Sequence, residues 1–478
     1  MKSDHIQQDQ ADLGTFGYAQ QLLRAMGGFS NFAISFSIIS ILTGAVTLYG
    51  YGLEMGGPLE MSLGWPLATL GTLTVAASMA ELCSAFPTAG GTYHWAAALG
   101  GPAAGWFVSI FSIIGMIAAQ VGINYSCAQF LLPFAGVEAS NANLAVAFAL
   151  ILLLQGAINH WGVRMVAILN DFSVTVHIVG VLILVGVLFW FAPKQPVSFL
   201  FEATNSNGRH FYWWAFLLGL LQAQWTYTGF DGSASLSEET SDPRRHAPWG
   251  IVLSVAISGI AGYLLLIAIT LAIHTIPVAL HTVDAQGNAV PAVIAIMQKA
   301  LGAKAGNAMA ALAAVAMWFC GLSGITSSSR SLFALARDGG LPGKRLATID
   351  RVHRTPAAAI WTIVGISLAA ITASNRIPLI TSVSTVALYL SYGVPVLLGL
   401  RSRPYWVSHA VWTLGRFGHT LNVVAVAFAG LICVVLVMPP NEPAGYLLAG
   451  IFLLALLGYQ RMKRTYRGPA WTAPPISR

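Results

Sequence analysis

The chain has 478 residues, of which 56% are hydrophobic and only 9% are charged. A soluble protein carries about 25% charged residues, so this composition excludes a water-soluble fold and predicts an all-α integral membrane protein. The formal net charge of +7 does not indicate nucleic-acid binding, because the basic residues are spread over short loops and form no single patch.

Twelve apolar runs predict twelve transmembrane helices, because about 20 helical residues span the hydrocarbon core of a bilayer. We expect these spans at 29–52, 64–86, 100–131, 142–159, 164–192, 212–236, 248–275, 306–334, 356–373, 377–399, 420–438 and 443–460. An even number of spans places both chain ends on one side of the membrane. The first run is too long and too rich in glycine for a signal peptide, so we expect it to be retained.

The basic residues distinguish the two sides of this topology. Of the 24 lysines and arginines, 19 fall on the side of the N-terminus, and the other side has only five: Lys194, Arg209, Lys299, Lys304 and Arg376. Cytoplasmic loops are rich in Lys and Arg. The N-terminal segment 1–28 and the basic tail 461–478 are therefore both predicted to be cytoplasmic, in a multi-pass protein of the cell membrane.

Two of the predicted spans contain residues that suit a broken helix. In the first, serines lead into Thr43-Gly44, and in the sixth, Gly229 and Gly232 flank Asp231. Glycine and serine also serve close helix packing, which is the alternative for either span alone. The first and sixth spans are at equivalent positions if ten helices form two halves of five, and such a pair is typical of an inverted-repeat transporter.

Four stretches carry a resemblance to a known family. They are FSIISILTG (36–44), ELCSAFPTAGGTYHW (81–95), YTGFDGSASLSEET (227–240) and SSSRSLFALARDGGLP (327–342). Together they resemble the amino acid–polyamine–organocation superfamily, and within it the amino acid, GABA and choline permeases. The resemblance implies a LeuT-like 5+5 inverted repeat over 29–399, with halves at about 29–192 and 212–399 and discontinuous helices 1 and 6. Helices 11 and 12 would follow within 400–460.

The resemblance also implies a substrate site at mid-membrane, between the unwound parts of helices 1 and 6. A new helix start at Thr43 and Gly44 would offer N–H groups and a positive dipole end to a substrate carboxylate. Carbonyl groups around three residues would accept from the substrate ammonium: Ser40, Trp225 and Thr228. The Trp225 ring would cover the substrate, with Tyr227 a weaker candidate beside Gly229. In the eighth span, Gly324 falls where some members carry a bulky aromatic lid, which predicts a roomier pocket.

Two further residues are candidates for gating and proton coupling. Asp231 is an acid at membrane depth, which family members link to gating; the alternative is that it stabilises the helix break. His177 matches a basic side chain that replaces the sodium ion of other relatives, and imidazole titrates near physiological pH, although a neutral structural histidine is equally compatible. Ser327 and Ser328 would lie near the same pocket, unless they bond back within their own helix.

These features predict a secondary active transporter for an amino acid, GABA or a choline-like substrate, with no cofactor and a proton gradient as the driving force, sodium being disfavoured. Substrate exchange is an alternative to symport, and the oligomeric state is left open. Gly321-Leu322-Ser323-Gly324 matches the GxSG motif of intramembrane proteases, but no histidine partner is expected within a span that follows it, so an enzyme is disfavoured. A channel is disfavoured because charged rings and filter repeats are not evident.

Two other sequence features give weaker predictions. The run SEETSDPRRH and the loop after the eighth span carry mixed charges, whose ion pairs would close an inner gate, with plain solvation as the alternative. No disulfide framework or metal site is expected, because the cysteines lie singly: Cys83, Cys127, Cys320 and Cys433.

Overall fold

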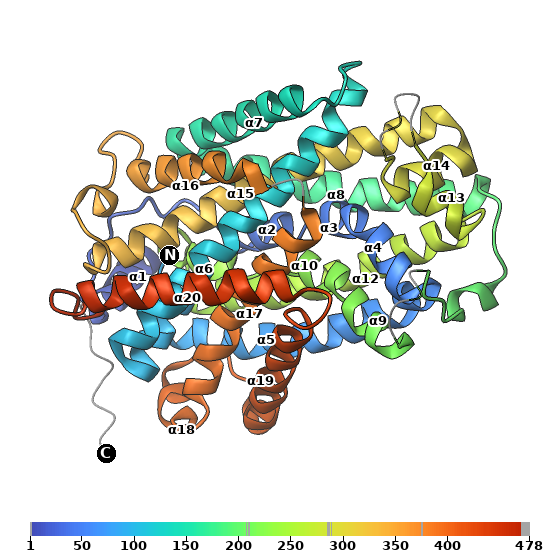
Figure 1. The fold of residues 1–478 in the computed structure, drawn as a ribbon. Helices are drawn as coiled ribbons and strands as arrows, with labels where there is room; N and C mark the ends of the chain where they lie inside the picture. Colours follow the sequence, from blue (N-terminus) through green and yellow to red (C-terminus); the bar gives the residue numbers. More distant parts are fainter. Residues whose placement is uncertain are drawn as a thin grey trace.

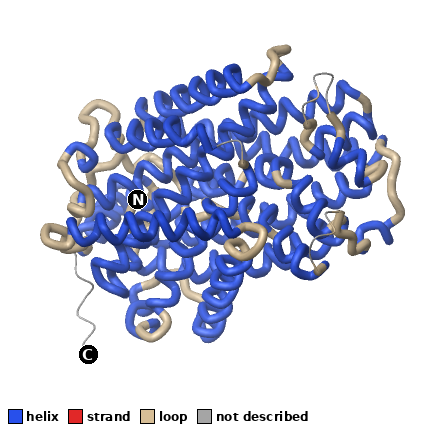
Figure 2. The backbone as a smooth tube through the Cα atoms, in the orientation of Figure 1, coloured by secondary structure: helices blue, strands red, loops and turns tan. Residues whose placement is uncertain are grey.

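A computed structural model describes residues 2–206, 208, 211–283, 287, 289–373 and 376–469 of the chain. Helices provide almost all of the regular structure in these ranges (Figure 2), and isolated β-bridges join Met26 with Thr240 and Val283 with Ala289. The described part of the chain confirms the all-α prediction.

Ten helical segments in the described ranges are long and apolar enough to cross a membrane. They are α2 with α3 (Gly28–Ile39 and Ile41–Thr47), η1 with α5 (Glu60–Gly64 and Trp65–Ala85), α6 (Thr92–Phe134), α7 (Asn141–Trp161), α8 (Val163–Phe191), α12 (Pro243–Leu271), α15 (Ala303–Arg337), α17 (Ile377–Gly399), η7 with α19 (Gly415–Phe417 and Gly418–Val435) and α20 (Glu442–Met462). Each corresponds to one of the twelve predicted spans.

The two other predicted spans are shorter or broken helices. The run 212–236 forms α9 (Tyr212–Gly219), α10 (Leu221–Thr226) and α11 (Gly232–Ser235), with turns between the last two. The run 356–373 forms α16 (Ala357–Ala369), of 13 residues, followed by a 3₁₀ turn, η5 (Ala370–Ala373). Broken or short helices do not reach the length of a regular span.

Short helices connect the long ones. They are α1 (Lys2–Thr15), α4 (Tyr49–Gly56), η2 (Val197–Phe201), η3 (Ser237–Glu239), α13 (Ile276–His281), α14 (Ala292–Leu301), η4 (Arg345–Ala347), α18 (Arg403–Trp406) and η6 (Val407–His409). The long helix α6 includes a break at Gly101, where φ is 85°, so its first turns precede the predicted start of that span.

The helices differ in how much of their surface is covered. In the most apolar part of α2 and α3, 89% of residues are buried inside the protein, compared with 17% in α20. Figure 1 shows α20 across the front of the bundle and α19 at its lower edge, with α2, α3 and α10 among the helices behind α20. The first span is therefore surrounded by protein, as a helix must be if it exposes polar backbone at membrane depth.

The beginning of the chain and the end of α20 meet at one end of the bundle (Figure 1). Tyr18 donates a hydrogen bond to Asp338, which also accepts from Tyr93, and Tyr466 donates to the Tyr93 hydroxyl. This contact places Tyr18 and Tyr466 at the same end of the bundle, which we call the N-terminal side.

Candidate functional site

The first membrane helix is broken at Ser40, between α2 and α3. Ser40 has φ 37° and ψ 83°, a left-handed conformation that costs a residue with a side chain about 1–2 kcal/mol. Its N–H still donates to Phe36 O, and its carbonyl accepts from the N–H groups of Thr43 and Gly44 at 2.8 and 3.0 Å. The helix therefore restarts immediately after a single non-helical residue.

This geometry corrects the predicted position of the break, which was Thr43-Gly44. The N–H groups of both residues are already bonded within α3, so they are not the free donors of a helix start. In a helix that begins at Ile41, the donors without an intrahelical acceptor are those of Ile41 and Leu42. The serine takes the left-handed position that glycine usually occupies, which moves the break three residues toward the N-terminus.

Gly44 has a steric role instead. A Cβ added to Gly44 would lie 2.7 Å from the Cα of Thr226, so the absence of a side chain allows α3 and α10 to approach closely. The two broken helices are therefore in direct contact next to their breaks.

The sixth predicted span is unwound over 227–231, between α10 and α11. Gly229 has φ 90° in this segment, which favours glycine, and a Cβ there would lie 2.1 Å from Ile38 Cγ2. Ser35 of α2 donates to the carbonyl of Phe230 at 2.7 Å and accepts from the N–H of Ser233 at 2.8 Å. The hydroxyl of one broken helix thus satisfies backbone groups that the other break leaves without helical partners.

Asp231 is held by α17. Its Oδ1 accepts a hydrogen bond from the Tyr392 hydroxyl at 2.7 Å, and the same hydroxyl accepts from the N–H of Gly229 at 3.0 Å. Asp231 is 4% exposed and does not line the cavity described below. The observed contacts are those of a carboxylate that stabilises the helix break, the alternative given above for this residue.

His177 lies beside the other break. Its Nε2 is 2.7 Å from the Ser40 hydroxyl, and its Nδ1 is 2.8 Å from the carbonyl of Ser173, one turn earlier in α8. The Ser40 hydroxyl is also hydrogen-bonded to the Thr43 hydroxyl. A buried histidine is therefore joined through two hydroxyls to the start of α3.

A small cavity of about 10 Å³, which has room for about one water molecule, lies between the two breaks, α6 and α15. It is lined by Ile38, Ile39, Thr43, Gly44, Met116, Ala119, Gln120, Ile123, Trp225, Thr226, Thr228, Cys320 and Gly324. The structure therefore brings together Thr43, Gly44, Trp225, Thr228 and Gly324 of the predicted substrate residues. An amino acid fits there only after the surrounding side chains move apart.

Several predicted site residues lie outside this lining. Tyr227 is fully buried, with its hydroxyl bonded to Thr69 and its ring 5.0 Å from that of Trp65. Gly229 packs on Ile38, and the Ser328 hydroxyl bonds back to Gly324 O at 2.7 Å, the alternative use of a helical serine. The predicted substrate residues Ser40, Tyr227 and Gly229 therefore do not line this cavity, and neither do Ser327 and Ser328, which were expected near the proton-coupling pocket.

Two of the three carbonyls expected to accept from a substrate ammonium, those of Ser40 and Trp225, are already occupied. Trp225 O accepts from both the N–H and the hydroxyl of Thr228, at 3.1 and 2.7 Å, and Ser40 O accepts from two N–H groups. Because a carbonyl oxygen has two lone pairs, neither has a free one. The expectation that these two carbonyls bind an ammonium does not hold in this arrangement.

Gly324 was predicted to make the pocket roomier, and this prediction is wrong. The Nε2 atom of Gln120 lies against this glycine, 2.5 Å from where a Cβ would be, so a side chain of α6 fills the space. Sequence reasoning missed Gln120, together with Met116, Thr226 and Cys320. A signal for the first was present: Gln120 and Asn124, and likewise Gln155 and Asn159, are amides four residues apart in apolar spans, which suits polar contacts between membrane helices.

A larger cavity of about 650 Å³ lies among α6, α17, α19 and α20, but it is lined by apolar side chains such as Phe107, Phe111 and Phe452. A zwitterion needs polar groups to fix its two charges, so this cavity does not suit one.

The N-terminal side of the bundle is closed by buried ion pairs. Arg330 of α15 forms a bidentate ion pair with Glu239, in which Nε and Nη2 donate to the two carboxylate oxygens at 3.2 and 2.9 Å. Both side chains are fully buried. Arg337 likewise forms a bidentate ion pair with Glu238, at 3.0 and 2.9 Å. Plain solvation of these two acids, the alternative considered above, is therefore wrong, and they join the end of the sixth predicted span to α15.

Two acids at this closure, Glu238 and Asp338, have lowered pKa values. Burial alone would raise the pKa of Glu238, but the charge and hydrogen bonds of Arg337 and the N–H of Ala89 lower it below the ordinary value. Burial alone would likewise raise the pKa of Asp338, but the hydrogen bond and charge of His94, the charge of Arg337 and the hydrogen bond from Tyr18 together lower it.

The N-terminal segment covers the same ion pairs. The N–H groups of Ala25 and Met26 donate to Glu239 O, each at 3.0 Å, and the Gln20 amide donates to Glu238 O at 2.8 Å. The guanidinium of Arg337 stacks 3.9 Å from the Tyr18 ring centroid. Residues before the first membrane helix thus form part of the closure.

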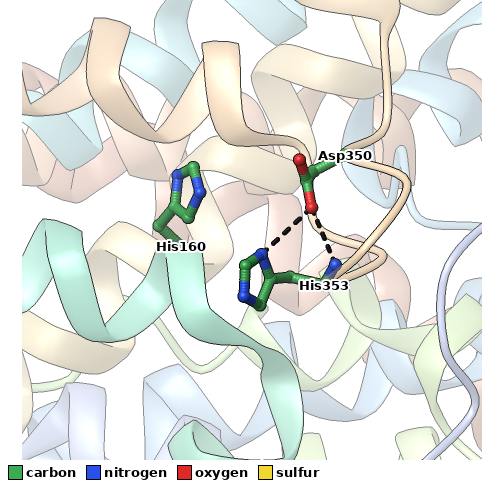
Figure 3. Close-up of side chains that lie close together, drawn as sticks. All are labelled: His160, Asp350 and His353. Carbon is green, nitrogen blue, oxygen red and sulfur yellow. Dashed lines mark hydrogen bonds and ion pairs between the residues drawn. The ribbon is translucent and has the colours of Figure 1, made fainter.

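A separate group of side chains, His160, Asp350 and His353, has its candidate metal-ligand atoms within 4.8 Å of one another (Figure 3). His160 Nδ1 accepts from the Trp361 indole, so a neutral ring keeps its proton on Nε2 and has no lone pair left for a metal. His353 Nδ1 is bonded to Asp350 at 3.0 Å. The remaining atoms supply fewer than the three protein ligands of an ordinary catalytic zinc site.

The GxSG motif does not form a protease centre. The Ser323 hydroxyl donates to Asn170 and to the carbonyl of Phe319, and the contacts found for it in the described chain include no histidine. All four cysteines are free.

The sequence matches the family model of amino acid permeases over residues 26–457. The chain belongs to the amino acid permease family. It is 34% identical to the amino-acid permease BAT1 homolog of Oryza sativa subsp. japonica, with 96% of this chain and 95% of the relative covered. It is 32% identical to the amino-acid permease BAT1 of Arabidopsis thaliana (91% and 89% covered). An uncharacterized amino-acid permease of Schizosaccharomyces pombe is 27% identical (95% and 88% covered).

The match confirms the resemblance to the amino acid–polyamine–organocation superfamily and a role in amino acid transport. The relatives are named as permeases, so the prediction that the permease is not an enzyme is confirmed. It is a multi-pass membrane protein with a small-molecule amino acid as its substrate.

Proposed function

We propose that the permease takes up an amino acid together with a proton across the cytoplasmic membrane, by alternating access, with both termini in the cytoplasm. The observation that carries this proposal is the contact of His177 with Ser40, because it joins a titratable side chain to the helix break next to the cavity-lining residue Thr43. The rest of the proposal rests on the two broken helices and on the closed N-terminal side.

The two breaks support an inverted repeat. They lie in the first and sixth predicted spans, in contact with each other, and the predicted halves of about 29–192 and 212–399 each begin with a broken helix. The N-terminal side carries the majority of basic residues, which supports a cytoplasmic orientation. Alternating access then requires the ion pairs Arg330–Glu239 and Arg337–Glu238 to separate or move when the site opens to the cytoplasm.

The hydrogen bonds of His177 link its protonation state to the orientation of a hydroxyl at the cavity. Its Nδ1 faces the carbonyl of Ser173, which can only accept, so Nδ1 carries a hydrogen. In the neutral ring Nε2 accepts from Ser40, and the Ser40 oxygen then accepts from Thr43. The Thr43 hydrogen points away from the cavity in that state.

Protonation of His177 reverses the direction of these two hydrogen bonds. Nε2 then donates to the Ser40 oxygen, the Ser40 hydroxyl donates to the Thr43 oxygen, and the Thr43 hydrogen is released to the cavity that its side chain lines. A substrate carboxylate gains a donor only when the proton is bound, which couples the two binding events. No sodium ion is needed in this scheme.

Uptake into proteoliposomes tests the proposal. We would measure accumulation of radiolabelled amino acids, GABA, choline and putrescine with and without an inward proton gradient. One proton per substrate and a gradient of one pH unit would sustain about a tenfold accumulation of an amino acid. The variant His177→Gln is expected to lose this accumulation and to keep exchange of internal for external substrate.

The matched control is His160→Gln, a histidine at the end of α7 that lies outside the cavity lining; its accumulation should equal that of the unmodified permease. Gradient-driven accumulation that persists in His177→Gln would contradict proton coupling through this residue. Uptake of choline or putrescine without any amino acid would contradict the proposed substrate class.

A further inference from the structure

Four buried amides connect α6, α7 and α15 next to the cavity. Gln120 and Asn124 lie on α6, and Gln155 and Asn159 lie on α7, all fully buried. Gln155 Nε2 donates to Asn124 Oδ1 at 2.9 Å, and Asn124 Nδ2 donates to Gln120 Oε1 at 3.0 Å. Of the four, only Gln120 reaches the cavity wall.

Backbone carbonyls fix the direction of this chain of amides. Gln120 Nε2 faces Gly321 O at 2.8 Å, and Gln155 Nε2 faces Trp318 O at 3.0 Å. A carbonyl only accepts, so the atom facing it in each glutamine must be the NH₂ group. Asn124 then has a single orientation that satisfies both neighbours, with its oxygen toward Gln155.

The fixed orientation decides what Gln120 offers to a substrate. Its oxygen is directed to Asn124, and its nitrogen lies against Gly324, a residue of the cavity wall. An NH₂ group has two hydrogens, and only one is used by Gly321 O. Gln120 therefore presents a donor to the cavity and keeps its oxygen bonded to Asn124.

Trp225 provides a second donor in the same wall. Its indole Nε1 is buried and has no hydrogen-bond partner in the described protein, although a buried indole N–H usually has one. Among the described residues that line the cavity, there is no Lys, Arg, His, Asp or Glu. The wall thus offers donors without any charge to balance an ionised substrate side chain.

We infer that Gln120 determines the specificity of the permease for amino acids whose neutral side chain carries an oxygen acceptor, a hydroxyl or a carboxamide. This inference rests on the proposed function, since it concerns the side-chain end of the same substrate site. Such a side chain satisfies the donors of Gln120 and Trp225. An apolar side chain of equal size leaves them unpaired, and a cationic one meets donors where it needs acceptors.

Isosteric pairs of amino acids isolate this effect. Threonine and valine differ by a hydroxyl in place of a methyl group, and asparagine and leucine have closely similar shapes. In proteoliposomes we expect threonine to be preferred over valine, and asparagine over leucine, by about tenfold in uptake efficiency. The competition is measured with both members of a pair against one labelled substrate, so that the ratio is independent of the amount of protein.

Two different variants should abolish the preference. Gln120→Met keeps the length of the side chain and removes the donor. Gly324→Ala leaves Gln120 in the sequence but places a Cβ 2.5 Å from its Nε2, which forces the amide out of its position. Both are expected to bring the threonine-to-valine ratio close to one. Gln195→Met, in which a glutamine bonded to Ile273 O outside the cavity is replaced in the same way, should keep the ratio of the unmodified permease.

The outcomes separate this inference from the proposed function. If the permease takes up amino acids with no preference within either pair, or if the preference survives in either variant, the role of Gln120 is wrong and the proposed transport stands. If no amino acid is taken up at all, the proposed function fails. A variant that no longer transports is assayed by the shift in its unfolding temperature with each member of a pair, and a preserved preference there also overturns the inference.

Discussion

The breaks in the first and sixth predicted spans are built differently. The first involves one residue, Ser40, whose carbonyl still accepts from two N–H groups of the next helix. The second extends over 227–231 and depends on a glycine with φ 90° and on the Tyr392 hydroxyl of another helix. One break is satisfied mostly by its own backbone, and the other by side chains from elsewhere in the protein.

This difference assigns separate tasks to the two breaks. At the first break, the backbone N–H and C=O groups largely have partners. The groups that can still change their hydrogen bonds are the hydroxyls of Ser40 and Thr43 and the imidazole of His177. At the second, Ser35 and Tyr392 bind groups that would otherwise have no partner at membrane depth. Changes at the second break should therefore affect the fold, and changes at the first should affect coupling.

The largest effect is expected for Gly229→Ala. The left-handed φ costs a residue with a Cβ about 1–3 kcal/mol, and the contact with Ile38 Cγ2 at 2.1 Å adds an overpacking cost of similar size. We expect a clear fall in the unfolding temperature of the purified permease and loss of uptake. Gly186→Ala in α8 is the control, because a Cβ there meets no atom within 4 Å. Equal unfolding temperatures for the two variants would contradict this account of the second break.

An effect of the same order, without backbone strain, is expected for Tyr392→Phe. The change removes the donor to Asp231 and the acceptor for Gly229 N–H, and each buried group left unpaired costs about 1–3 kcal/mol. Thermal unfolding measures the loss. The control is Tyr389→Phe on the same helix, whose hydroxyl meets the Thr72 hydroxyl, a group that can rotate to a new partner. A control variant as unstable as Tyr392→Phe would show that the helix break is not the source of the effect.

The smallest effect on stability is expected at Ser40. Glycine adopts a left-handed conformation without strain, so Ser40→Gly should be more stable than Ser40→Ala by about 1 kcal/mol. Both variants lose the hydroxyl that meets His177, so both should lose gradient-driven accumulation to the same extent. Accumulation that is intact in Ser40→Gly alone would mean that the backbone, and not the hydroxyl, carries the coupling.

Much of the fold was predictable from composition and pattern. Ten predicted spans correspond to long apolar helices, and the two that differ are those in which glycine or short length interrupts the helix. The breaks were placed in the correct spans. The exact residue of the first break was missed because it depends on which residue adopts the left-handed conformation, and serine is not the residue that sequence patterns assign to it.

The site was predictable only in part. Thr43, Gly44, Trp225, Thr228 and Gly324 line the cavity. The first two and Thr228 lie in stretches that resemble the family, and Trp225 and Gly324 lie just before such stretches. Tyr392 was missed because its contact with Asp231 joins residues 161 positions apart, and local patterns contain no record of such a contact. Gln120 was missed because Gly324 was interpreted alone, without the side chain that fills the space beside it.

The pair Arg330–Glu239 sets a condition on how the permease opens on its N-terminal side. Both groups are fully buried, and separating them without water would leave two bare charges at a cost of several kcal/mol each. Water must therefore enter before or as the helices part, and the opening step includes the hydration of an ion pair. Solutes that lower water activity should slow turnover more than they weaken substrate binding, and the transport rate should depend steeply on temperature.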